Sequence, residues 1–310
     1  MLRRLLLLAT VCASMAATGC DETGTDADDA VAAARLEDRL FTAMNKDDFG
    51  AAGDIVGEMY LLRDKDPLNY RNTFMLGAAS FWWIAEAGRP NPGINPIMIL
   101  SQGIPNVLQA FPDVIQNDPE NGAGASALLG AFLSDTGFDR AAGRALVESA
   151  SINAPQAGLF QQMHIRSSAA ADDTLTAQAI DWGFKWWEWC NGGPLDRNSF
   201  DFTGKVKPPT DGPTGFCWGS SRVPHGFEGS MMIFGDLLVK GGKLDLARRA
   251  YLNARLSSNY GRWKYKDQLE ARLASNLAQR YSTYASHDPA NWAPIGLPTY
   301  GCTQCHASAP

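Results

Sequence analysis

The chain has 310 residues, a formal net charge of -6 and 45% hydrophobic residues. The acidic balance excludes an electrostatic attraction to nucleic acid, so we expect no nucleic-acid partner. The hydrophobic content is sufficient for an ordered globular core. Beyond the N-terminal apolar run, no stretch approaches the length of a membrane-spanning helix.

Residues 1–19 have the pattern of an export signal. Arg3 and Arg4 supply the positive start, and an apolar run extends from Leu5 to Ala17. This run is too short to span a bilayer as a helix of the mature protein. We therefore expect export, and removal of the two arginines takes the net charge from -6 to about -8.

Gly19 and Cys20 end this segment, and small residues directly before a cysteine resemble the lipobox of bacterial lipoproteins. The resemblance implies that Cys20 is lipidated and attaches the protein to the bacterial cell envelope, on its periplasmic or cell-surface side. Ala17 stands where leucine is usual in that motif. Ordinary cleavage, which leaves a soluble periplasmic protein, is the alternative. Residues 20–29 are acidic and lack apolar anchors, so we expect a solvated tether there.

The segment 30–285 is predicted to be one all-α domain. Alternating runs of β-branched residues are few, whereas alanine-rich segments with helical periodicity are abundant. The expected helices cover 30–45, 47–63, 68–87, 121–135, 138–152, 156–170, 172–189, 226–240, 243–257 and 263–285. Because 88–118 and 191–224 are rich in glycine and proline, we expect them to be irregular. Residues 286–310 are expected to form an extended tail.

Two parts of this domain repeat the same spacing of small and large residues. Gly130, Ala142, Leu146 and Ser149 recur as Gly235, Ala247, Tyr251 and Ala254. A looser copy contains Phe49, Ala52 and Val56. The spacing resembles the tetratricopeptide repeat, which implies a solenoid of antiparallel helix pairs whose small residues allow close approach. A generic antiparallel helical bundle is the alternative.

Aromatic residues gather on the helix predicted at 172–189. Trp182, Trp186 and Trp189 fall on one helical face, where aromatic stripes usually form core. The functional alternative is a concave aromatic groove that binds a partner. His164 is alone on its predicted helix and is expected to be a packed or surface residue.

The cysteines suit an oxidising compartment. With Cys12 removed in the signal and Cys20 lipidated, the remaining cysteines are Cys190, Cys217, Cys302 and Cys305. Cys190 and Cys217 are expected to form a disulfide that closes the irregular segment between them.

Cys302, Cys305 and His306 form a C-x-x-C-H motif close to the C-terminus. It resembles the haem-attachment segment of bacterial c-type cytochromes. The resemblance implies one haem c, with thioether bonds to both cysteines and His306 as the proximal ligand of the haem iron. Only four residues follow His306, so a distal ligand would come from upstream. The candidates are His225, Met231, Met232 and His287.

Two alternatives compete for this motif. Cys302 and Cys305 can form a disulfide, or they can join His306 and a further ligand around zinc or copper. The sequence contains no G-x-S-x-G, H-E-x-x-H or P-loop motif, so we do not expect an enzyme of those classes.

These features predict a lipid-anchored helical-repeat protein that carries one haem c. Its function would be electron transfer, or assembly with a partner redox protein, at the cell envelope. The alternative is a non-enzymatic scaffold or ligand-binding lipoprotein that carries a C-terminal disulfide instead of haem.

Overall fold

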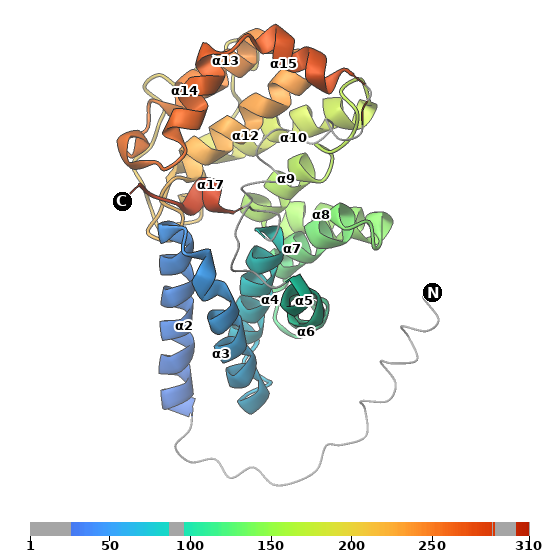
Figure 1. Cartoon of the computed structure of the whole chain (residues 1–310), viewed down its shortest axis with the longest axis vertical. Coiled ribbons are helices and arrows are strands. Elements are labelled where there is room, and N and C mark those ends of the chain that lie inside the picture. Colours follow the sequence, from blue (N-terminus) through green and yellow to red (C-terminus); the bar gives the residue numbers. More distant parts are fainter. Residues whose placement is uncertain (1–25, 87–95, 287, 289–301, 310) are drawn as a thin grey trace.

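The structure is a computed structural model that describes residues 26–86, 96–286, 288 and 302–309. These residues form helices and loops without any strand, which confirms the prediction of an all-α protein (Figure 1). Across the same ranges, no helix is long and apolar enough to cross a bilayer. The export signal 1–19, Cys20 and His287 lie outside the described residues.

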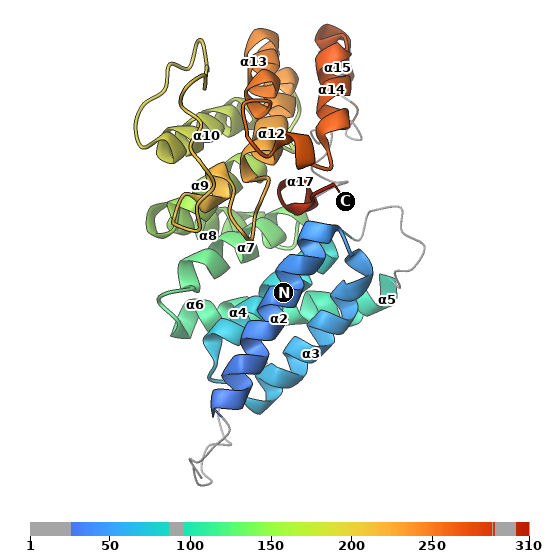
Figure 2. The same cartoon turned by 90° about the vertical axis from the view of Figure 1, so that its left-hand side faces the viewer.

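The helices pack in chain order from one end of the molecule to the other (Figures 1 and 2). The first end contains α2 (Asp26–Lys46), η1 (Phe49–Ala51), α3 (Ala52–Lys65) and α4 (Tyr70–Ala85). The middle contains α5 (Pro96–Met98), the π-helix η2 (Ile99–Gly103), α6 (Ile104–Asn117), α7 (Gly122–Asp135), α8 (Arg140–Asn153) and α9 (Pro155–His164). The opposite end, called the second end below, contains α10 (Thr174–Asn191), α11 (Gly215–Trp218), α12 (Gly226–Lys240), α13 (Leu244–Ala254), η3 (Tyr260–Arg262), α14 (Lys266–Ala274) and α15 (Leu277–Tyr284). The short helix α17 (Thr303–His306) returns to the interface between the two ends.

Glycines allow two helix pairs to approach closely. A Cβ atom added at Gly130 of α7 would lie 2.6 Å from the carbonyl oxygen of Gly143 in α8. A Cβ added at Gly235 of α12 would lie 2.3 Å from the ring of Tyr251 in α13. Such distances are too short for a side chain, so only glycine fits at these two positions. Asp139 also accepts a hydrogen bond from the Ala142 backbone N–H and caps the start of α8.

Several predicted boundaries differ from the structure. The segment 88–118 was expected to be irregular, but its described part is helical from Pro96 to Asn117. Pro105 stands where this helical run changes from the π-helix η2 to α6, and the wider π turn interrupts the regular hydrogen-bond ladder that a proline would otherwise break. Helix α2 starts at Asp26, within the expected tether 20–29.

Two further predictions differ from the structure in the C-terminal quarter of the chain. The single helix expected at 263–285 is interrupted after Ala274, because the Asn276 side chain caps a new helix start at α15. The extended tail expected at 286–310 is wrong for Thr303–His306, which is helical and buried. Segment 191–224 is irregular as expected, apart from the short α11.

The aromatic residues form the core of the second end. Trp186 and Trp187 are fully buried, and the Trp187 ring packs edge-on against Trp218 and Phe227. The central tryptophan of the predicted stripe is therefore core and not the floor of an open groove. Beside this cluster, Cys190 and Cys217 form the predicted disulfide, with a Cα–Cα distance of 5.8 Å.

Candidate functional site

The C-x-x-C-H motif lies in the interface between the two ends of the molecule, which we call the seam. Helix α17 contacts α12 of the second end and α2 of the first end (Figure 2). Cys302 packs against the apolar core of the first end, whereas Ala307 belongs to the core of the second end. The motif therefore joins two hydrophobic cores that are far apart in the sequence.

Hydrogen bonds hold the motif from both sides of the seam. The partners come from α4, from the loop before α12 and from the residues around 263–265. The bonds run from Thr303 N–H to Glu86 Oε1 (3.1 Å), between Tyr265 Oη and Thr303 Oγ1 (2.9 Å), from Trp263 Nε1 to the Gln304 carbonyl (2.7 Å) and from His225 N–H to the Cys305 carbonyl (2.9 Å). Since these groups are buried, displacement of the motif would break the hydrogen bonds and leave buried polar atoms without partners.

The residues after the motif extend this attachment. Ser308 N–H donates to the Asn45 carbonyl (2.9 Å), and Ala309 N–H donates to the Arg262 carbonyl (2.7 Å). The Ser308 hydroxyl lies 2.9 Å from Nε2 of His225. Ser308 also pairs with Trp263 in an isolated antiparallel bridge. The chain end is therefore bound to α2 and to the second end at once.

Both cysteines of the motif are free thiols. Burial and then the nearby Glu86 carboxylate raise the pKa of Cys302 well above its usual range. Burial raises the pKa of Cys305 to about 12, while a hydrogen bond with Ser230 opposes the rise. Thiols with raised pKa values stay protonated at neutral pH and are poor nucleophiles and poor metal ligands.

These observations bear on the two alternatives for the motif. The Cys302–Cys305 disulfide is not formed, and the sulfur of Cys302 faces the first core while that of Cys305 faces Gly229 and Ser230 of α12. Over the ranges that the structure covers, no three His, Cys, Asp or Glu side chains come together as a metal site. A zinc or copper centre at Cys302, Cys305 and His306 therefore has no further ligand among the described side chains.

His306 is buried as a neutral imidazole. Its ring stacks on Phe41 of α2, with 6.1 Å between centroids, and Nδ1 lies 3.3 Å from Asn45 Oδ1. Burial lowers the pKa of His306 to about 4, a hydrogen bond with the Arg222 backbone opposes this, and the charge of His225 lowers it further. The neutral form is the one that can ligate iron.

Haem c requires space beside both sulfurs and one imidazole nitrogen that faces the iron. Neither condition is met where residues 302–309 are packed. A Cβ added at Gly229 would lie 2.7 Å from Cys305 Sγ, so α12 lies directly against the sulfur. The His306 ring is engaged by Asn45 and by the Arg222 backbone. A porphyrin does not fit this arrangement, and attachment requires the segment to leave the seam.

Of the described candidates for a distal haem ligand, two lie in the core of the second end and one lies beside the motif. Met231 and Met232 are fully buried in the core of the second end. His225 does lie close to the motif, but its nitrogens face Ser308 Oγ (2.9 Å) and Glu228 Oε1 (3.5 Å). His164 is remote and pairs with Asp135 at 2.7 Å, in keeping with a packed or surface residue.

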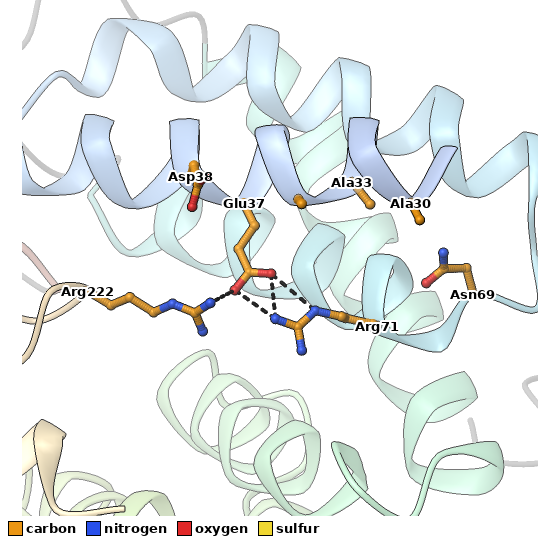
Figure 3. A pocket seen from close by; sticks show the side chains of 8 residues that line it. Ala30, Ala33, Glu37, Asp38, Asn69, Arg71 and Arg222 are labelled. Atoms are coloured by element: carbon orange, nitrogen blue, oxygen red, sulfur yellow. Dashed lines mark hydrogen bonds and ion pairs between the residues drawn. The ribbon is translucent and has the colours of Figure 1, made fainter. Parts of the chain in front are cut away.

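An ion-pair cluster next to the motif was not predicted. Figure 3 shows the Glu37 carboxylate of α2 between two guanidinium groups. Arg71 of α4 lies 2.8 Å from it and Arg222, from the loop before α12, lies 2.5 Å from it. The same Arg222 lies over Phe41, the ring that stacks on His306, at 5.1 Å from its centroid. No sequence signal could have found this cluster, because the three charged residues are far apart in the chain.

The lowered pKa of His306 predicts how the free energy of unfolding depends on pH. Its pKa in the folded protein is about 4, below the ordinary value of 6.5, so the unfolded chain binds the proton more tightly between these values. Stability from this group is therefore complete above pH 6.5 and is lost as the pH falls towards 4, by about 3 kcal/mol in total. We expect His306→Gln to lack this part of the pH dependence. Urea unfolding at a series of pH values measures it, and equal slopes for both proteins would contradict the assignment.

Comparison of the chain with protein-family models, with curated proteins and with solved structures gives no match.

Proposed function

We propose that the protein is a lipid-anchored, non-enzymatic helical scaffold of the bacterial cell envelope. In this proposal the C-terminal motif locks the two ends of the helical body into one rigid surface for a protein partner. The observation that carries it is the burial of Cys305 and His306 in the seam, with Cys302 partly buried against the first core and their chain bonded to both ends. The free thiols then act as small apolar side chains, and no disulfide is needed.

We also propose that the helix pairs α7–α8 and α12–α13 belong to an array of tetratricopeptide-like repeats. The matched spacings around Gly130 and Gly235 support this, as does the contact of Gly235 with Tyr251. Arrays of this kind bind partner proteins over extended surfaces made by successive repeats. A rigid seam would keep such a surface in one shape.

A second proposal is that residues 302–309 carry haem c in another position. The C-x-x-C-H motif in a chain with an export signal favours it. Covalent attachment to Cys302 and Cys305 would then precede or prevent docking of the segment in the seam. The His306 imidazole would supply the proximal ligand, and the haem would supply one-electron chemistry.

One experiment separates the two proposals. The full chain is expressed in a bacterium that matures c-type cytochromes, and its intact mass and thiol content are measured. The scaffold proposal expects no porphyrin mass, and two thiols that react fully only after unfolding, because Cys305 is buried, Cys302 is partly buried and the pKa values of both are raised. The haem proposal expects one porphyrin mass, a Soret band and no reactive thiol in the unfolded chain.

A variant tests the locking contact itself. Gly229→Val places methyl groups where only 2.7 Å separates a Cβ from Cys305 Sγ, so α17 should be displaced from α12. Both thiols should then react in the folded protein. Gly57→Val is the matched control, because a Cβ at Gly57 of α3 meets nothing within 4 Å. Protected thiols in Gly229→Val would overturn the role of this contact.

A further inference from the structure

We propose that one end of the molecule is a membrane-contacting tip that inserts apolar side chains into the surface of a phospholipid bilayer. The tip consists of the first turns of α2, the end of α3 and the turn that leads into α4. It carries Val31, Tyr60, Leu61 and Leu68. The inference rests on the proposed lipidation of Cys20 and adds the orientation of the protein on the membrane.

The chain length between the lipid and the fold sets the first constraint. Only five residues separate Cys20 from Asp26, where α2 begins. Even when fully extended, this segment spans about 20 Å at roughly 3.5 Å per residue. The start of α2 is therefore held next to the bilayer, whichever conformation residues 21–25 adopt.

The position of that helix start sets the second constraint. Figures 1 and 2 place the start of α2 at one extreme of the longest axis of the molecule, with the end of α3 and the start of α4 beside it. The ion pair between Asp29 and Lys65, at 3.9 Å, connects the start of α2 to the last residue of α3. A lipid on Cys20 thus directs all three helix ends towards the membrane.

Four large apolar side chains are exposed at this tip. The exposed fractions are 73% for Leu68, 64% for Leu61, 50% for Val31 and 45% for Tyr60. Leu68 lies in the turn between α3 and α4, and the other three lie within about 8 Å of a helix end, at 1.5 Å per residue. Transfer of these groups from water into the interfacial region of a bilayer is favourable.

The charges of the tip point to an apolar contact and not to attraction by anionic lipid. Lys65 is paired with Asp29, and Arg63 is paired with Asp113 at 2.8 Å. Asp64 and Asp66 add negative charge to the same turn. Among the described side chains of the tip there is therefore no polybasic surface, and the net negative charge repels anionic lipid, so added salt should not weaken the contact.

This contact would hold the long axis of the molecule away from the membrane plane. The second end, with α12 to α15, would then be the part furthest from the bilayer (Figure 1). A partner protein in the aqueous space would meet the seam and the second end before the tip.

The test uses the full lipidated chain in vesicles of phosphatidylethanolamine and phosphatidylglycerol. An environment-sensitive fluorophore is attached at Leu68→Cys, and its quenching by spin-labelled lipids is measured. Ile152→Cys is the control, because Ile152 is 76% exposed on α8, away from the tip. We expect quenching several-fold stronger at position 68 than at position 152, at low and at high salt. Leu61→Asp should weaken the quenching at position 68 without releasing the protein.

Equal quenching at the two positions, in protein that stays on the vesicles, would overturn the membrane-contacting tip while leaving the lipid anchor intact. The anchor is tested separately by the intact mass of the purified mature protein, which should begin at Cys20 and carry the mass of the lipid. A mature protein without the lipid mass would overturn the proposed anchor instead. The two failures are therefore distinguishable.

Discussion

Replacement of Asp236 by alanine is expected to lower the free energy of unfolding by about 3–5 kcal/mol. Asp236 lies on α12 and is 1% exposed. Its carboxylate accepts hydrogen bonds from Arg272 Nε (2.9 Å), Arg280 Nη2 (3.0 Å) and Tyr251 Oη (2.6 Å). These partners come from α13, α14 and α15, so one carboxylate connects four helices of the second end. Without it, two guanidinium groups that are mostly buried lose their acidic partner.

A matched control is available on the same helix as Arg272. Glu270 forms an ion pair with Arg255, but their side chains are 40% and 43% exposed. Glu270→Ala should therefore cost about 1 kcal/mol or less, because solvent screens the pair. Chemical denaturation of both variants measures the difference. Similar losses for Asp236→Ala and Glu270→Ala would show that burial does not govern the Asp236 cluster.

Removal of the Cys190–Cys217 disulfide is the second large effect that we expect. The two cysteines are 27 residues apart, and a crosslink across such a loop stabilises a protein by about 3.5 kcal/mol through the entropy of the unfolded chain. The double variant Cys190→Ala and Cys217→Ala should lose about this amount. The loop it closes carries Phe200 and Phe202, which are fully buried in the core of the second end. Loosening of the loop should therefore be visible as increased exposure of these aromatic rings.

Thermal unfolding with and without a reductant measures the effect of the disulfide. The reductant should lower the stability of the wild-type protein and leave the double variant unchanged. Cys302→Ala with Cys305→Ala is the control, because both residues are free thiols and their loss should not alter the response to reductant. A wild-type protein that is insensitive to reductant after unfolding and refolding would contradict a stabilising disulfide.

The sequence predicted most helices well where periodicity and capping agreed. The helix predicted at 138–152 corresponds to α8 because Asp139 both ends the preceding turn and caps the helix. Prediction failed at 88–118, where the prolines suggested loops although the π-helical turn η2 directly before Pro105 accommodates it. It also failed at 263–285, where the helical pattern continued across the cap at Asn276. In both cases a local feature, a π turn before a proline or a capping asparagine, decided the helix boundary against the wider pattern.

The position of the C-terminal motif in the seam could not be predicted from the sequence. A helix of four residues such as Thr303–His306 is not stable by itself, so local propensity cannot predict it. Its position depends on Glu86, Trp263 and Tyr265, which contact it from distant parts of the chain. Burial of the motif then follows from these long-range bonds and not from the C-x-x-C-H pattern.

The sequence by itself determined the all-α class, the Cys190–Cys217 pair and the close approach of Gly235 to its neighbouring helix. Each depends on composition or on spacing within a short stretch of chain. Only the tertiary structure decided where the C-terminal motif lies and what surrounds it. The physical reason is that the pKa of about 4 at His306 and the raised pKa values of Cys302 and Cys305 come from burial between two cores. Burial of that kind exists only once both ends of the molecule have folded and met.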